Sequence, residues 1–203
     1  MPDSKKPMTL IEALEVLHAV RRGEVVVTTM GNAREWQKLG KDPLNFVFVP
    51  SSMGQATSLG LGIALAQPDR KVVVCNGDGS MLMNLGSLVT ISAQAPPNLV
   101  VILFDNGVYE VTGAQPTAAA PLLRPNSAPV DFGALARASG FSQVHAFNAV
   151  EPWRNAVGEI LRGRGPTFVH LRVEPMADAG LPAFPGPAPE RALALRAELT
   201  RRE

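Results

Sequence analysis

Short runs of apolar and often β-branched residues recur along almost the whole chain. They lie at residues 24–29, 45–49, 71–75, 98–104, 142–146 and 167–173. Each run is too short for a typical helix and is bordered by glycine, proline or polar residues. Uninterrupted apolar runs are typical of strands that are buried on both faces of a parallel sheet. We therefore predict about six strands.

Helical spacing occupies most of the intervals between these runs. Thr9 and Glu12 have the spacing of a capping box, and apolar residues follow at helical intervals up to Gly23. Further helices are predicted from near residue 33, and at residues 55–67, 82–95, 132–139, 150–161 and 189–202. This alternation predicts one α/β domain over residues 1–203, doubly wound and mostly parallel, with a proline-rich tail from about residue 174.

Polar or glycine-rich segments follow four of the predicted strands, at residues 28–32, 51–54, 77–80 and 105–109. In open α/β sheets, ligands bind beyond the carboxyl ends of the strands, where these segments would meet. The segment 113–130 is also long for a loop in a compact domain, and such loops are more often functional than filler.

The segment from Gly77 to Ser80 is the most informative of the four. Glycines on both sides of Asp78 allow a tight turn and a close backbone approach to a ligand. The start of the following helix favours an anion such as phosphate, which Asp78 alone would repel. A hard cation between carboxylate and phosphate resolves this conflict, and magnesium is the usual one. Asn106 offers a second oxygen at the next strand end.

Simpler interpretations stand beside this one. A glycine–aspartate–glycine sequence after a strand is often only a turn. It is not a nucleotide P-loop, because the Gly-Lys-Ser/Thr ending is absent, and Leu82 stands where a dinucleotide fingerprint needs its third glycine. Gly60 and Gly62 lie inside a predicted helix, where packing is the expected role. Cys75 is expected to be a small buried hydrophobe.

The amino-acid composition excludes several classes of binding site and partner. A net charge of +1 gives no indication of nucleic acid or a charged membrane surface as partner. One cysteine excludes an internal disulfide and any multi-cysteine metal site, and the three histidines have no ligand spacing. We see no signal peptide and no run of about 18 apolar residues that would span a membrane. We therefore expect a cytoplasmic protein.

The combination of motifs resembles the magnesium–diphosphate signature of thiamine-diphosphate enzymes. Gly77 to Ser80 is followed after some twenty residues by Asp105 and Asn106. Within that superfamily the chain is similar to the β subunits of sulfopyruvate decarboxylases and the matching half of phosphonopyruvate decarboxylases. The similarity is carried by residues 27–29, 34–35, 52–54, 78–80, 84–88 and 115–117.

The resemblance implies a set of cofactor contacts. Magnesium would be bound by the side chains of Asp78 and Asn106 and by the main-chain carbonyl of Val108. The diphosphate would lie against Gly77, Gly79, Ser80 and Tyr109. The segment of Ser51, Ser52 and Met53 would hold the pyrimidine edge, with Met53 as the apolar support of the bent cofactor; Gly31 and Asn32 would form another phosphate-side loop. Glu110 is a candidate catalytic group, although a loop carboxylate without special role is the competing interpretation.

The family also implies a partner. Its pyrimidine-binding domain supplies a glutamate that activates the cofactor, and the 203 residues are filled by one α/β unit. We therefore expect a hetero-oligomer with a pyrimidine-binding subunit that decarboxylates a small 2-oxo acid. The sequence departs from the family pattern in three places. Asp105 replaces an asparagine that is generally not the metal ligand, and residues 28–33 differ from the sequence expected for the phosphate-side loop. Leu181 stands where relatives have an arginine, which leaves the substrate open. A 2-oxo acid oxidoreductase subunit and a non-catalytic cofactor-binding protein remain alternatives.

Overall fold

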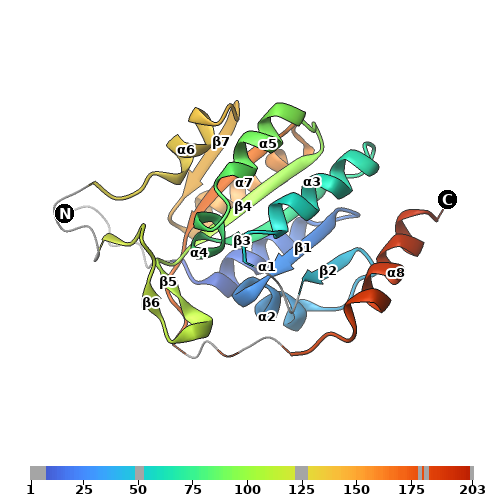
Figure 1. Ribbon diagram of the computed structural model, residues 1–203, viewed down its shortest axis with the longest axis horizontal. Coiled ribbons are helices and arrows are strands. Elements are labelled where there is room, and N and C mark those ends of the chain that lie inside the picture. Colours follow the sequence, from blue (N-terminus) through green and yellow to red (C-terminus); the bar gives the residue numbers. More distant parts are fainter. Residues whose placement is uncertain (1–7, 49–52, 122–127, 178–179, 181–182, 202–203) are drawn as a thin grey trace.

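A computed structural model describes residues 8–48, 53–121, 128–177, 180 and 183–201. Its core is a six-stranded sheet in the order β2-β1-β3-β4-β8-β7, and every neighbouring pair is parallel (Figure 1). The strands are β1 (Val25–Thr29), β2 (Asn45–Phe48), β3 (Val72–Gly77), β4 (Leu99–Asp105), β7 (Gln143–Phe147) and β8 (Thr167–Arg172). The predicted six-stranded α/β fold is confirmed.

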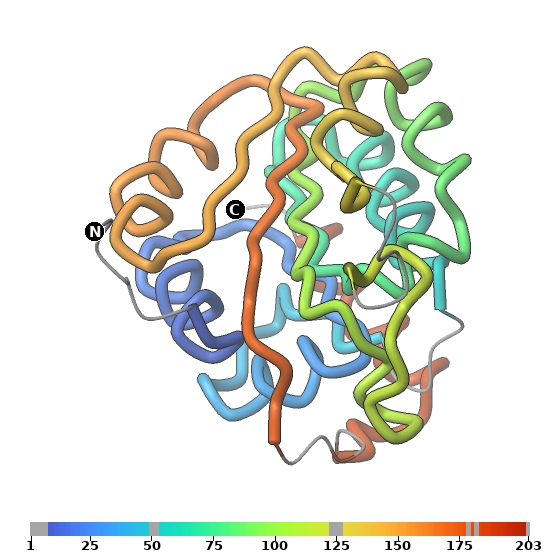
Figure 2. Tube along the Cα trace, turned by 90° about the vertical axis from the view of Figure 1, so that its left-hand side faces the viewer, coloured from blue at the N-terminus to red at the C-terminus, as the bar shows by residue number. Residues whose placement is uncertain are grey.

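Helices cover both faces of this sheet, as the side view in Figure 2 shows. They are α1 (Leu10–Val20), α2 (Met30–Leu39), α3 (Ala56–Ala66), α4 (Asp78–Leu82), α5 (Gly86–Gln94), α6 (Phe132–Ala138), α7 (Val150–Arg162) and α8 (Ala188–Leu199). On one face α1, α2 and α7 contribute to a core that includes Trp36 and Trp153. On the other face α3, α5 and α6 cover a second core, which Leu195 of α8 joins at the edge strand β2.

Successive side chains along a strand point to opposite faces of the sheet, so each central strand contributes to both cores. In β3, Val72 and Val74 face one layer of helices, whereas Val73 and Cys75 face the other. Cys75 is fully buried, and this burial raises the pKa of its thiol, in agreement with a packing role. Gly60 of α3 lies against the same strand. A Cβ atom there would come within 2.1 Å of Val74 Cγ2, so glycine lets the helix approach the sheet closely.

The capping box predicted before α1 is present. The Thr9 hydroxyl accepts the Glu12 N–H at 3.3 Å, and the Glu12 carboxylate accepts the Thr9 N–H at 2.9 Å. The next predicted boundary is wrong, because Met30 to Asn32 are not a loop before a helix. Helix α2 begins at Met30 directly after β1, and Met30 makes the turn with a left-handed φ of 52°.

The single helix predicted at residues 82–95 is also wrong. It is divided into α4 and α5, and α4 already begins at Asp78. The break lies where Gly54 approaches from a distant part of the chain. The Asn84 side-chain amide donates to the Gly54 carbonyl at 2.9 Å, and the Gly54 N–H donates to Ser80 Oγ at 2.8 Å. These contacts join the two segments at the point where α4 ends.

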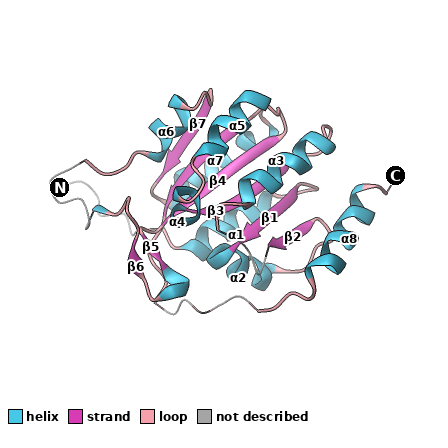
Figure 3. Ribbon diagram, in the orientation of Figure 1, coloured by secondary structure: helices cyan, strands magenta, loops and turns pink. Residues whose placement is uncertain are grey.

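A small hairpin lies apart from the main sheet (Figure 3). Strands β5 (Val108–Tyr109) and β6 (Gln115–Pro116) are antiparallel and are connected by the 3₁₀ turn η1 (Glu110–Thr112). The long segment 113–130 is therefore partly structured, since it contains β6; its residues 122–127 lie outside the described part. Within the described ranges, no helix is long and apolar enough to cross a membrane.

Candidate cofactor site

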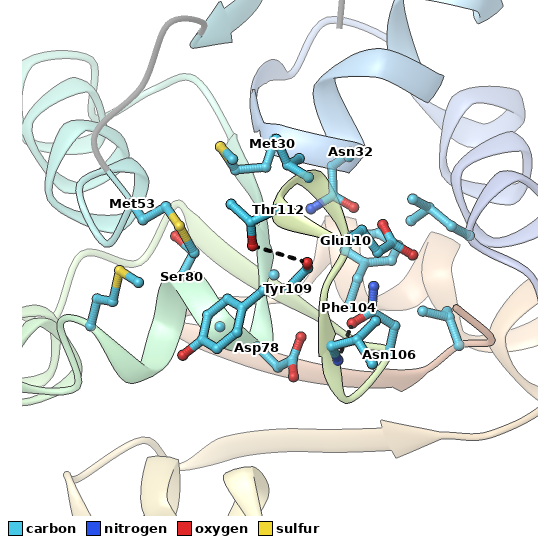
Figure 4. A pocket seen from close by; sticks show the side chains of 18 residues that line it. Met30, Asn32, Met53, Asp78, Ser80, Phe104, Asn106, Tyr109, Glu110 and Thr112 are labelled. Atoms are coloured by element: carbon cyan, nitrogen blue, oxygen red, sulfur yellow. Dashed lines mark hydrogen bonds between the residues drawn. The ribbon is translucent and has the colours of Figure 1, made fainter. Parts of the chain in front are cut away.

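A cavity of about 310 Å³ opens at the carboxyl end of the sheet (Figure 4). It lies beyond the ends of β1 and β3, where the strand order reverses direction, and extends to β4 and the β5–β6 hairpin. This is the position at which doubly wound sheets bind ligands. Its 18 lining residues are Leu10, Met30, Gly31, Asn32, Met53, Gly77, Asp78, Gly79, Ser80, Met83, Phe104, Asn106, Val108, Tyr109, Glu110, Val111, Thr112 and Val173.

The structure brings the predicted site residues together here. Every one of them that is described lines the cavity, from Gly31 and Asn32 on α2 to Glu110 in the hairpin. Ser51 and Ser52 lie outside the described residues, as does Leu181. One detail of the prediction is wrong: Gly31 and Asn32 belong to the first turn of a helix instead of a separate loop.

Asp78 is a buried carboxylate at the floor of this cavity, with 2% of its surface exposed. Burial raises its pKa to about 6, and the negative charge of Asp105 adds to this effect. Hydrogen bonds from Thr117 and from the N–H groups of Gly79 and Asp78 act in the opposite direction. The Thr117 hydroxyl donates to Asp78 Oδ2 at 3.0 Å. Within the described part of the chain, no salt bridge neutralises Asp78.

Asn106 projects into the cavity from the turn after β4 (Figure 4). Its Oδ1 accepts the N–H of Val108 at 2.9 Å. Val108 begins the hairpin, which a hydrogen bond from Thr117 N–H to the Gly107 carbonyl at 2.9 Å closes. Asp78 and Asn106, 28 positions apart, therefore face the same space from neighbouring strands, β3 and β4.

Asp105, the last residue of β4, stabilises the position of the neighbouring Asn106. It is 6% exposed, and its Oδ2 lies 2.9 Å from His170 Nε2 and 3.3 Å from Arg172 Nη1 on the adjacent strand β8. The rings of Phe132 and His170 pack in a T-shaped arrangement with a centroid distance of 5.7 Å. Asp105 does not line the cavity. Its contacts bind β4 to β8 at the level of Asn106.

Glycine is required where Tyr109 crosses the start of α4. A Cβ atom at Gly79 would lie 2.4 Å from Tyr109 Cε1, so only a bare backbone fits beneath the ring. A Cβ atom at Gly77 meets nothing within 4 Å. The two glycines of the motif therefore differ. The packing of the Tyr109 ring requires glycine at position 79. At Gly77 the space beside the backbone is open, so a ligand can occupy it.

Glu110 is enclosed by several segments. Its Oε1 accepts the Met176 N–H at 2.8 Å, and its Oε2 lies 3.0 Å from where a Cβ of Gly31 would be. Burial raises the pKa of Glu110, while hydrogen bonds from Met176 and Asn106 and the charge of Arg34 lower it. This carboxylate is therefore not the exposed loop group of the competing interpretation.

Several lining residues were not identified from the sequence. Met30, Met83, Phe104, Val111 and Val173 give the cavity a largely apolar wall around its polar floor. Thr117, which hydrogen-bonds Asp78 from 39 positions away, was noted only as part of a resembling segment. No local pattern marks such contacts. In the described part of the chain, no cluster of three or more histidine, cysteine or acidic side chains forms a metal site.

Comparisons with known proteins agree with this geometry. Residues 26–171 match the family described as thiamine pyrophosphate enzyme, C-terminal TPP binding domain. The chain belongs to this family. A solved structure titled as a putative thiamin diphosphate-dependent enzyme from Mycobacterium smegmatis matches 86% of this chain and 34% of its own, with a TM-score of 0.66 at 20% identity. That likeness supports the fold alone.

Two curated proteins are similar to this chain in sequence. A phosphonopyruvate decarboxylase of Streptomyces viridochromogenes is 43% identical over 85% of this chain, which corresponds to 42% of that protein's length. A sulfopyruvate decarboxylase subunit beta of Methanothermobacter thermautotrophicus is 40% identical over 81% of this chain and 82% of its own. The resemblance inferred from the motifs is confirmed.

The unequal roles of the two glycines give a prediction for the cofactor-free chain. Gly79→Ala should displace the ring of Tyr109, the chain's only tyrosine, whereas Gly77→Ala should leave it in place. Because the ring is half-buried and can swing aside, the loss in the free energy of unfolding should be modest, about 1 kcal/mol. NMR of tyrosine labelled with ¹³C on the ring reports this directly. An unchanged signal in Gly79→Ala would contradict the close packing.

Proposed function

We propose that this chain is the diphosphate-binding subunit of a thiamine-diphosphate-dependent 2-oxo acid decarboxylase. In this proposal, magnesium is bound by the side chains of Asp78 and Asn106 and by the main-chain carbonyl of Val108. The observation that carries the proposal is the buried carboxylate of Asp78, which no described cation neutralises and which lines the same cavity as the amide of Asn106. Oxygen ligands of this kind suit a hard divalent cation.

The residues present fit both groups. A carboxylate that is buried and repelled by a second carboxylate is stabilised when a divalent cation binds beside it. Gly79 and Ser80, at the start of α4, line the cavity where a diphosphate would lie, and the free space at Gly77 permits its close approach. The apolar wall, including Met53 and Val111, suits the ring system of the cofactor.

Thiamine diphosphate, when bound, would supply a carbon nucleophile for the carbonyl of a 2-oxo acid and a cationic ring that accepts the electron pair released as carbon dioxide leaves. The chain's own part is to bind and orient. Asp78 and Asn106 hold the cation at the floor of the cavity, and Met53 gives apolar support from the segment before α3. The apolar wall excludes water from the space above, which strengthens the electrostatic interactions there.

The pyrimidine side of the site is proposed to come from a partner subunit. A relative of which this chain covers 82% is named a subunit beta, which supports an enzyme of more than one chain. Among the described residues that line the cavity, Glu110 is the single carboxylate besides Asp78. Because Glu110 is fixed beside Gly31 and Met176, we assign the activating glutamate to the partner.

We propose a small 2-oxo acid that carries a second anionic group as substrate, by analogy with the names of the two curated relatives. An oxidoreductase subunit is less well supported, because its clusters commonly require several cysteines and the chain has one, which is buried in the core. A non-catalytic cofactor-binding role would leave the same cavity without turnover.

Asp78→Ala should abolish the magnesium-dependent binding of thiamine diphosphate. The fold should persist, because the substitution removes a desolvated charge and no apolar packing. Calorimetric titrations with magnesium and with chelator measure the affinity, and circular dichroism checks the fold. Asp69→Ala, which removes an exposed carboxylate, is the matched control. Equal affinity in Asp78→Ala and wild type would refute the metal assignment.

The chain by itself should release no carbon dioxide from 3-phosphono- or 3-sulfo-2-oxopropanoate, and should gain activity when a pyrimidine-binding subunit is added. The reason is that the groups described in the cavity bind the diphosphate side and leave the pyrimidine without an activating carboxylate. Carbon dioxide release would be followed for this chain, for the partner and for their mixture. Turnover by this chain alone would overturn the assignment of the partner.

A further inference from the structure

Met30 stands where β1 ends and α2 begins, with no linking residue between the strand and the helix. Its φ of 52° is left-handed, a region that glycine enters freely and that other residues enter only at a cost. A strand-to-helix turn as sharp as this exposes the side chain of its central residue above the end of the sheet. The backbone at Met30 therefore holds its side chain over the carboxyl edge of the sheet.

The neighbouring glycine does not make this turn. The backbone of Gly31 is not left-handed, and glycine is needed there for space. A Cβ atom at Gly31 would lie 3.0 Å from Glu110 Oε2 and 3.1 Å from Met176 Cε. A glycine at position 30 would make the turn without strain. The side chain of Met30, and not the conformation of its backbone, therefore accounts for a methionine at this position, and strain of this kind is typical of functional sites.

The Met30 side chain belongs to the cofactor cavity and not to the interior of the protein. It is half-buried and lines the cavity, and neither of the two cores that the described residues form includes it. Figure 4 shows it pointing toward Met53 and away from Asp78 and Asn106. The two thioethers therefore line a part of the cavity that is separate from the proposed metal ligands.

We infer that Met30 is a cofactor-binding residue that packs against the rings of thiamine diphosphate, as a second apolar support beside Met53. The inference rests on the proposed function, because a diphosphate held near Asp78 and Asn106 leaves the rings of the same molecule for the apolar part of the cavity. Both rings of thiamine are aromatic, and a thioether makes favourable contacts with aromatic rings. The strained turn keeps the thioether directed at them.

Three substitutions separate the side chain of Met30 from its backbone. Met30→Ala removes the thioether and keeps the strained left-handed turn, whereas Met30→Gly removes both. Met30→Leu keeps an apolar side chain of similar volume. The matched control is Ala95→Gly, which relieves a left-handed φ of 44° at the exposed end of α5, away from the residues that line the cavity.

The test combines cofactor affinity with thermal unfolding of the full-length chain. In calorimetric titrations with thiamine diphosphate at saturating magnesium, Met30→Ala and Met30→Gly should each raise the Kd about 10-fold, because each loses the apolar contact. Met30→Leu should stay close to wild type, and Ala95→Gly should match it. Without cofactor, Met30→Gly should melt about 2–4 °C above Met30→Ala, and Ala95→Gly by a similar amount above wild type, because glycine relieves the strain.

The other outcomes are distinct. Wild-type affinity for thiamine diphosphate in both Met30→Ala and Met30→Gly would overturn the inference and leave the proposed function standing. So would a Met30→Gly variant that melts below Met30→Ala, because the left-handed turn would then not be strained by its side chain. If the wild-type chain binds no thiamine diphosphate in the presence of magnesium, the proposed function itself fails, and this inference fails with it.

Discussion

The buried carboxylate of Asp78 is the constraint on which the rest of the site depends. At 2% exposure and next to the charge of Asp105, it is an unfavourable place for an anion, and burial raises its pKa to about 6. Hydrogen bonds from Thr117 and two backbone N–H groups offset part of this penalty. A divalent cation bound in the cavity would offset the rest of the free-energy cost of burying this negative charge. The site therefore contains a buried negative charge, on Asp78, that the stability of the fold does not require.

The fold places the Asp78 carboxylate at a defined position. Parallel strands β1, β3 and β4 end at the same edge of the sheet, so residues from three distant segments converge without long loops. These three strands are almost fully buried between two layers of helices. The β5–β6 hairpin then covers the start of α4 with Tyr109, where Gly79 alone permits the contact. Asp105, His170 and Arg172 fix the adjacent corner.

The strands, the domain class and the glycine-rich and polar strand ends that line the cavity could be predicted because each has a local signal, whereas the apolar wall of the cavity was missed. Apolar runs marked the strands, and Gly77 with Asp78 marked a ligand-binding strand end. The errors arose where distant contacts decide. Gly54 meets Asn84 and Ser80 where α4 ends and the predicted single helix breaks. The hydrogen bond from Thr117 to Asp78, and the fixing of Glu110 by Met176, join residues 39 and 66 positions apart. No pattern along the chain indicates such pairs.

The most direct test of the central claim is the position of the metal ion. Crystals of the chain with thiamine diphosphate and manganese, which can replace magnesium at oxygen sites, would locate the ion by anomalous scattering. We predict one manganese peak at the carboxyl end of β3, directly bound by the Asp78 carboxylate, the Asn106 amide oxygen and the Val108 carbonyl. A manganese ion bound elsewhere, or thiamine diphosphate bound without any ion next to Asp78, would contradict the account.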